Sequence, residues 1–126
     1  MIDNFHNSNH EAINRIEQIC GRKILFEKID ITDFDSLNAL FKKYPIKSVI
    51  HFASLKAVGE SSKIPLEYWR VNVGGAINLL RAMTENNVKK LVFSSSATVY
   101  GDATRFPNMI PIPGKPILIY ILCFTN

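Results

Sequence analysis

Apolar residues in this chain fall into two kinds of pattern. Short runs that contain apolar residues predict strands at residues 1–2, 24–29, 48–53 and 91–96. Apolar residues at helical spacing predict helices over residues 8–20, 32–44 and 65–87. Strands and helices that alternate with short links predict a parallel sheet with right-handed crossovers.

The polar residues between these segments indicate where the helices begin and end. Ser8 followed by Glu11 is a capping-box pattern, which predicts Ser8 as the first cap. Gly21 is expected to end that helix, and Thr32 is expected to cap the second one. Inside the third helix, Gly74 and Gly75 each cost about 1 kcal/mol of helix stability. We therefore expect another backbone to pass close to this pair.

Composition fits one globular domain or part of one. The chain has 126 residues, of which 47% are hydrophobic and 21% charged, with a net charge of +4. Its lysine pairs lie near predicted helix ends, which favours a solvated surface over nucleic-acid binding.

Cysteine and apolar content bear on location and on metal binding. Cys20 and Cys123 form no CxxC motif, so we expect a reducing compartment and no metal site. No secretory leader is visible, and the apolar run at residues 116–124 is too short to span a bilayer. These features predict a cytoplasmic protein without a membrane segment.

Three serines directly follow the apolar run at residues 91–93, within the strand predicted over residues 91–96. Ser94, Ser95 and Ser96 cannot all be satisfied inside an apolar strand, so they are expected at its carboxyl end. Ligands bind at that end of open parallel sheets, and small hydroxyls there suit a polar substrate. The alternative is a serine-rich turn that caps the next segment.

Long motifs in the chain resemble the UDP-glucose 4-epimerase family. They are residues 51–61 (HFASLKAVGES), residues 93–102 (FSSSATVYGD) and the opening at residues 3–8 (DNFHNS). Residues 102–113 are similar to the fungal members, in which a mutarotase domain is often fused. The resemblance covers residues 2–113 and implies an extended short-chain dehydrogenase/reductase with a Rossmann NAD domain.

The resemblance implies a set of NAD-binding residues near the strand ends. Asp3 is expected to bind the adenosine ribose hydroxyls and to favour NAD over NADP, although Asp3-Asn4 alone would suit an Asx-turn. Asp30 and Ile31 would hold the adenine, or Asp30 begins a capping turn. The remaining members of the set are Asn4, Phe5, His6 and Asn7 at the ribose, with Phe52, Ala53 and Lys56 at the end of the strand at residues 48–53.

Lys56 and Asn72 each carry an alternative, and Ser54 departs from the family. Lys56 is expected to reach the pyrophosphate or ribose, though a lone loop lysine is more often solvated. Ser54 stands where the family usually has glycine. Asn72 is expected to support a backbone network or to lie on the helix surface.

The resemblance also implies the substrate site and the reaction. Ser96 matches the active-site serine, with Ala97 and Thr98 beside it at the substrate. In the family, NAD takes a hydride from C4 of the hexose, the 4-keto sugar turns, and the hydride returns to its other face. Ser96 would hydrogen-bond the 4-oxygen of UDP-galactose or UDP-glucose and relay its proton to a tyrosinate.

Two family motifs have no match in this sequence. Its glycines do not form the Gly-rich turn that follows the first Rossmann strand, and no tyrosine has a lysine four residues later. Residues 114–126 depart from the family. We therefore expect an α/β fold with a partial Rossmann-like parallel sheet and flanking helices, lacking the first strand and Gly-rich turn. Residues 1–113 would form a partial NAD-binding domain and residues 114–126 a divergent apolar tail.

These departures leave more than one prediction for structure and function. Residues 117–124 are expected to enter the sheet, either in the vacated place or at the edge beside residues 91–96. The first functional hypothesis is a truncated epimerase, weakly active or inactive. The alternatives are a related NAD-dependent sugar-nucleotide dehydratase, or a non-catalytic fragment that associates with an intact subunit. The family forms homodimers, and apolar faces at residues 34–41 and 69–83 are candidate contacts.

Overall fold

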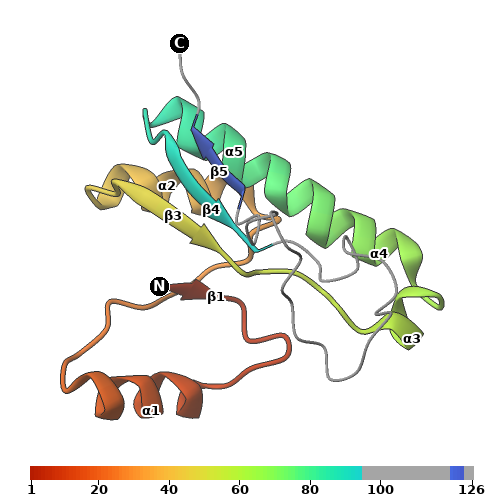
Figure 1. Ribbon diagram of the computed structural model, residues 1–126, viewed down its shortest axis with the longest axis horizontal. Coiled ribbons are helices and arrows are strands. Elements are labelled where there is room, and N and C mark those ends of the chain that lie inside the picture. Colours follow the sequence, from red (N-terminus) through yellow and green to blue (C-terminus); the bar gives the residue numbers. More distant parts are fainter. Residues whose placement is uncertain (95–119, 124–126) are drawn as a thin grey trace, which may run out of the picture. The chain divides into compact units, whose positions relative to one another are not determined.

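The computed structural model describes residues 1–94 and the backbone of residues 120–123. They belong to two compact units, one formed by Met1–Pro45 and Ala53–Asn87, the other by Ile46–Phe52 and the described residues from Val88 onward. Figure 1 shows the elements: β1 (Ile2–Asp3), α1 (His10–Cys20), β2 (Glu27–Lys28), α2 (Phe34–Lys43), β3 (Ser48–His51), α3 (Val58–Ser61), α4 (Pro65–Trp69), η1 (Arg70–Gly74), α5 (Gly75–Glu85), β4 (Lys90–Phe93) and β5 (Tyr120–Cys123).

The first unit contains a short parallel pair of strands. Ile2 of β1 is in register with Glu27 of β2, and Asp3 is in register with Lys28. The strand predicted over residues 24–29 is therefore reduced to two residues, because β1 offers only two residues to pair with. Both strands end at the same edge, which brings the polar residues after Asp3 and after Lys28 together.

The second unit contains a three-stranded sheet in the order β3-β4-β5. β3 and β4 are parallel, as predicted, with Ser48 opposite Lys90 and His51 opposite Phe93. β5 pairs antiparallel with β4, so residues 120–123 take the edge position, one of the two predicted places. Parallel strand pairs and helices that alternate with strands along the chain confirm the predicted α/β class.

Two predicted helix caps are wrong by one residue. Asn9 caps α1, its side-chain oxygen accepting from the Glu11 N–H, and Asp33 caps α2 by accepting from the Ser36 N–H. The predicted caps, Ser8 and Thr32, instead donate their hydroxyls to carboxylates near the strand ends. Charge-assisted hydrogen bonds are stronger than neutral ones, which explains the preference. Gly21 ends α1 at φ 63°, as predicted.

The predicted helix over residues 65–87 is continuous but not uniformly α-helical. Figure 1 shows α4 and α5 as one long rod, and the junction between them, η1, is a π-helical turn. A Cβ built on Gly75 would lie 2.6 Å from Cγ2 of Ile31, whereas one on Gly74 would meet nothing within 4 Å. The expected close approach therefore occurs at one glycine only, and the approaching group is a side chain rather than a backbone.

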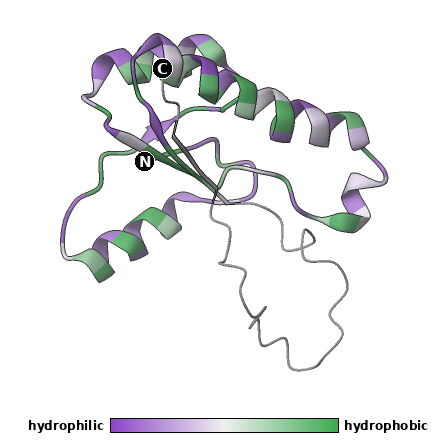
Figure 2. Ribbon diagram, turned by 45° about the horizontal axis from the view of Figure 1, so that its top comes forward, coloured by the Kyte–Doolittle hydropathy of each residue, from purple (hydrophilic) through white to green (hydrophobic). Residues whose placement is uncertain are grey.

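The core of the first unit lies where α2 packs against α5. The residues buried there are Leu37, Phe41, Leu79, Ala82 and Met83. This packing excludes Leu37 and Phe41 as partner contacts, so that part of the predicted docking face is wrong. Figure 2 shows hydrophobic and hydrophilic residues interleaved along the long helix. Within residues 1–94 and 120–123, no helix has the length and apolarity needed to cross a bilayer.

Candidate functional site

Asp3 organises the turn at the carboxyl end of β1. Its Oδ1 accepts the Phe5 N–H at 2.7 Å and the Ser8 hydroxyl at 2.8 Å. The first of these bonds is the Asx-turn that the sequence offered as an alternative. Among the described residues, Oδ2 of Asp3 has no hydrogen-bond partner in its own unit. The carboxylate therefore shapes the turn with one oxygen and presents the other.

A direct hydrogen bond joins the ends of the two parallel strands. The Asn4 side-chain amide donates to Oδ2 of Asp30 at 2.8 Å, across 26 positions of sequence. The side-chain Oδ1 of Asn4 accepts the His6 N–H at 2.9 Å, so this side chain also fixes its own turn. Asp3, Asn4 and Asp30, three of the predicted cofactor residues, are thus brought to one strand edge.

The Asp30 carboxylate is held by donors on both oxygens. Its Oδ1 accepts the N–H of Thr32 at 2.8 Å and the Thr32 hydroxyl at 2.7 Å. Partial burial acts to raise the pKa of Asp30, but hydrogen bonds from Asn4 and Thr32 and the nearby Arg70 charge outweigh it and hold this pKa below its ordinary value. Asp30 is therefore an oriented carboxylate that is ionised at neutral pH.

Phe5 adopts a left-handed backbone conformation in the same turn. Its φ is 60°, which is uncommon for a residue with a bulky side chain. The ring stacks on Phe26 with centroids 4.9 Å apart, and its N–H is bound by Asp3. These contacts hold the conformation and with it the loop that carries Asn4, His6 and Asn7. His6 and Asn7 are exposed at this loop.

Ile31 is buried, unlike its polar neighbours. Only 7% of it is exposed, and its side chain packs against the backbone of Gly75. The Asn78 side-chain amide donates to the Thr32 carbonyl at 2.9 Å and to the Ile31 carbonyl at 3.4 Å. These contacts fix the backbone after Asp30. The role of Ile31 at an adenine ring stays a prediction.

The loop that carries Lys56 is fixed on both sides of that residue. Asn72 in η1 binds Leu55 twice, accepting its N–H at 2.8 Å and donating to its carbonyl at 2.9 Å. The Tyr68 hydroxyl donates to the Ala57 carbonyl at 2.9 Å. Asn72 is therefore a backbone support, and the surface alternative is wrong. Lys56 itself is exposed and makes no ion pair with described residues of its unit.

The other predicted residues around this loop divide between the two units. Ala53 is exposed in the first unit, and Phe52, which is 73% exposed, belongs to the second. In the second unit, the Ser94 N–H donates to the His51 carbonyl at 3.1 Å and extends the β3–β4 pairing. Ser96, Ala97 and Thr98, the predicted substrate residues, lie outside the described residues. Residues 1–94 and 120–123 contain no His, Cys, Asp or Glu group arranged to hold a metal ion.

Sequence reasoning missed two residues of the Asp30 surroundings. Thr32 donates to Asp30 twice, and Arg70 in η1 donates from Nη1 to the Thr32 hydroxyl oxygen at 2.8 Å. The contact of Thr32 was predictable, because an aspartate side chain often accepts hydrogen bonds from the residue two positions later. Arg70 is 38 positions from Thr32 and has no local signal.

Comparison with known proteins places this site in context. Residues 1–122 match the model of the NAD dependent epimerase/dehydratase family. The bifunctional protein GAL10 of Pachysolen tannophilus is 63% identical over 113 residues, which is 90% of this chain and 16% of that protein.

Two solved structures share both the fold and much of the sequence. The UDP-glucose-4-epimerase of Stenotrophomonas maltophila, with bound NAD and formylated UDP-arabinopyranose, has a TM-score of 0.77 and 46% identity over 84% of this chain and 32% of that one. That of Bifidobacterium longum, with NAD+ and UDP, has a TM-score of 0.77 and 44% identity over the same shares of the two chains, 84% and 32%. The chain thus spans between a sixth and a third of the length of these proteins.

Proposed function

Because the chain belongs to the NAD dependent epimerase/dehydratase family, we propose that it supplies part of the NAD site of a UDP-glucose 4-epimerase, which interconverts UDP-galactose and UDP-glucose. The observation that carries this proposal is the Asn4–Asp30 hydrogen bond, which gathers carboxylates at the ends of two parallel strands. Carboxyl ends of parallel strands are where such sheets bind dinucleotides. A related NAD-dependent dehydratase would use the same edge, but the relatives named above favour the epimerase.

The hydrogen-bond acceptors at this edge fit the adenosine half of NAD. Oδ2 of Asp3 is available to accept from a ribose hydroxyl, and its charge disfavours a 2′-phosphate at that position. Oδ2 of Asp30 carries one hydrogen bond, from Asn4, and has room to accept a second from an amino group. Asn4, Phe5, His6 and Asn7 would line the ribose, and Ile31 would lie at the adenine.

The remaining predicted residues would serve the rest of the cofactor and the sugar nucleotide. Lys56, on a loop fixed at Leu55 and Ala57, would place a positive charge near the pyrophosphate, with the Phe52 and Ala53 backbone close by. NAD, when bound, accepts a hydride from the sugar and returns it. Ser96 would hydrogen-bond the sugar 4-oxygen, with Ala97 and Thr98 beside the substrate. Since no tyrosine here has a lysine four residues later, we expect this 126-residue chain alone to be weakly active or inactive.

The proposal extends to organisation and location. Residues 1–113 would form the partial NAD-binding domain and residues 114–126 a divergent tail, within which residues 120–123 pair with β4. The proposed substrates are water-soluble sugar nucleotides, and Cys20 and Cys123 form no CxxC motif. Both features favour the cytoplasm.

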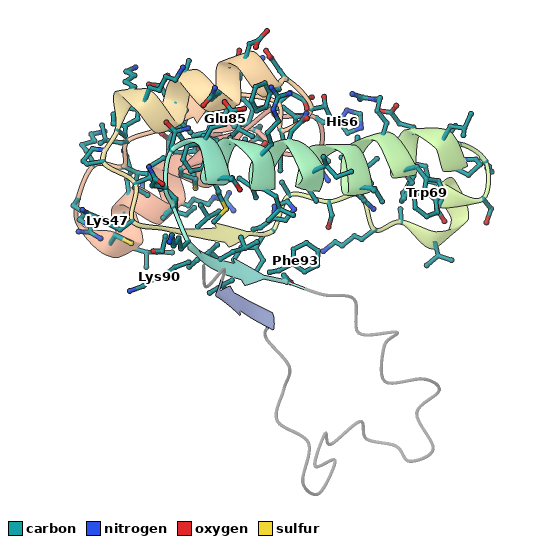
Figure 3. The ribbon with its side chains drawn as sticks, turned by 90° about the horizontal axis from the view of Figure 1, so that it is seen from above. His6, Lys47, Trp69, Glu85, Lys90 and Phe93 are labelled. Atoms are coloured by element: carbon teal, nitrogen blue, oxygen red, sulfur yellow. The ribbon has the colours of Figure 1, made fainter. Side chains whose placement is uncertain are left out.

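A second candidate function is association with another copy of this chain or with an intact epimerase subunit. The observation that favours it is an exposed apolar stripe along the long helix, formed by Leu66, Trp69, Val73 and Ile77 with 82%, 66%, 41% and 58% of each residue exposed. Their spacing of three or four residues places them on one helix face. Figure 3 shows Trp69 projecting from the α4 end of the rod. Exposed apolar stripes of this kind are typical of interaction surfaces, and we propose a homodimer through this one.

The NAD site is tested by titrating the full chain with ADP-ribose and following backbone-amide NMR signals. We expect shifts at Asp3, Asn4 and Thr32, because these amides and side chains surround the proposed adenosine site. Asp3→Asn removes the negative charge, so the preference for ADP-ribose over its 2′-phosphate form should fall about tenfold. Absent shifts at these residues, or a preference unchanged by Asp3→Asn, would contradict the proposal.

A further inference from the structure

A chain of hydrogen bonds connects the long helix to the Asp30 carboxylate. Glu67 in α4 accepts from Nε and Nη2 of Arg70, at 2.8 and 2.6 Å. Arg70 then donates from Nη1 to the Thr32 hydroxyl oxygen at 2.8 Å, and Thr32 donates to Asp30. Every member of this chain belongs to the first unit. Three N–H groups of Arg70 are thereby committed to these two partners.

The direction of each bond is set by what each group is able to donate. A guanidinium has donors only, so the Thr32 oxygen acts as acceptor toward Arg70. A threonine hydroxyl has a single proton, and here that proton is directed at Oδ1 of Asp30. Arg70 therefore restricts the rotation of the hydroxyl and strengthens its bond to the carboxylate.

The consequence for Asp30 is a difference between its two oxygens. Oδ1 takes both donors of Thr32, whereas Oδ2 takes only the Asn4 amide. The carboxylate is pinned at three points, and the oxygen with remaining acceptor capacity is Oδ2. An acceptor held in one orientation selects a ligand that donates a hydrogen bond at that point and rejects one that presents an oxygen there.

From this arrangement we propose that Thr32 and Arg70 are positioning residues, which aim the free lone pair of Asp30 Oδ2 at the exocyclic amino group of adenine. The inference rests on the proposed function, since it assumes that Asp30 meets the adenine. It adds that base selectivity depends on a residue of the long helix that acts through Thr32. Glu67 contributes by fixing two of the Arg70 nitrogens and leaving Nη1 for Thr32.

The test compares two probes that differ at one position of the base, AMP and IMP. AMP carries the amino group, whereas IMP carries an oxygen that would face the Asp30 carboxylate. Affinities for the full chain and its variants are measured by NMR titration, with the fold of each variant checked by circular dichroism. We expect the unmodified chain to bind AMP at least tenfold more tightly than IMP, as a hydrogen bond to a charged group provides.

The variants separate positioning from stability. Thr32→Val and Arg70→Met should bring the AMP affinity down to near the IMP affinity while leaving the IMP affinity unchanged. Thr32→Ser keeps the hydroxyl and should keep the preference. Arg15→Met is the matched control, because Arg15 is an exposed arginine paired with Glu11 on α1 and should leave both affinities unchanged.

The outcomes distinguish a failure of the positioning role of Thr32 and Arg70 from a failure of the proposed adenine role of Asp30. If the unmodified chain prefers AMP but Thr32→Val and Arg70→Met retain that preference, the positioning role is overturned and the adenine role of Asp30 stands. A chain that binds AMP and IMP equally overturns the adenine role itself, and the inference falls with it. Loss of both affinities in equal measure assigns Thr32 and Arg70 a structural role only, which also overturns the inference.

Discussion

At the scale of single residues, aspartate side chains at or after the strand ends form the turns and helix starts of this chain. Asp3, Asp30 and Asp33 each accept hydrogen bonds from residues two to five positions later, and each shapes a turn or a helix start. Hydrogen bonds from Ser36 lower the pKa of Asp33, as donors lower that of Asp30. Such turns are built from local chemistry, which is why small polar residues gather there.

Local chemistry also limits what was predictable about these residues. The resemblance led to Asp3, Asn4 and Asp30, and the structure brings them to one edge. The capping pattern assigned Ser8 and Thr32 to helix starts, whereas both donate to these carboxylates. A hydroxyl can accept a helix N–H or donate to a carboxylate, so spacing alone cannot assign its role. Arg70 was not predictable, because its contact with Thr32 depends on how the long helix packs.

At the scale of elements, the long helix combines one π-helical turn with a close contact. Apolar periodicity predicted a helix over residues 65–87, and the rod from Pro65 to Glu85 agrees. Periodicity did not reveal η1, because a single wider turn leaves the apolar spacing nearly intact. The wider turn carries both Arg70 and Asn72, which bind Thr32 and Leu55. π-Helical turns are frequent at functional sites, in agreement with this placement.

Gly74 and Gly75 offer a matched pair of substitutions in this helix. Gly75→Ala should destabilise the chain by about 1–2 kcal/mol, because the new Cβ would lie 2.6 Å from the branched, buried side chain of Ile31. Gly74→Ala meets open space and should stabilise it by up to about 1 kcal/mol. Urea denaturation followed by circular dichroism measures both. Equal shifts of the two midpoints in the same direction would show that helix propensity, and not the Ile31 contact, determines the change in stability.

At the scale of the whole molecule, the described strands form two separate sheets. β1 pairs with β2, and β3, β4 and β5 form the other sheet. The sequence predicted one partial parallel sheet without the first Rossmann strand, and it did not reveal that the described strands divide into two short sheets. Apolar content identified residues 117–124 as a strand, and antiparallel pairing with β4 gives residues 120–123 a partner. Its direction was not predictable, because a long connection permits either orientation.

The exposed stripe leads to a prediction for the assembly. Trp69→Glu should weaken self-association at least tenfold, because it places a charge at the large aromatic residue of the stripe. Ile19→Glu changes an equally apolar residue on α1, 85% exposed and outside the stripe, and should leave association unchanged. Sedimentation velocity over a range of concentrations measures both. A chain that stays monomeric at every concentration would rule out a homodimer through the stripe. So would a result in which only Ile19→Glu weakens self-association.

We propose that this chain carries part of an epimerase site, including Ser96. The most direct test of this proposal is a chimera in which the 113 matched residues replace their counterparts in the Pachysolen tannophilus relative, assayed for conversion of UDP-galactose to UDP-glucose. We expect turnover, a loss of about 10²–10⁴-fold in Ser96→Ala, and little change in the neighbouring Ser94→Ala. An inactive but folded chimera, or a Ser96→Ala variant as active as Ser94→Ala, would contradict the assignment.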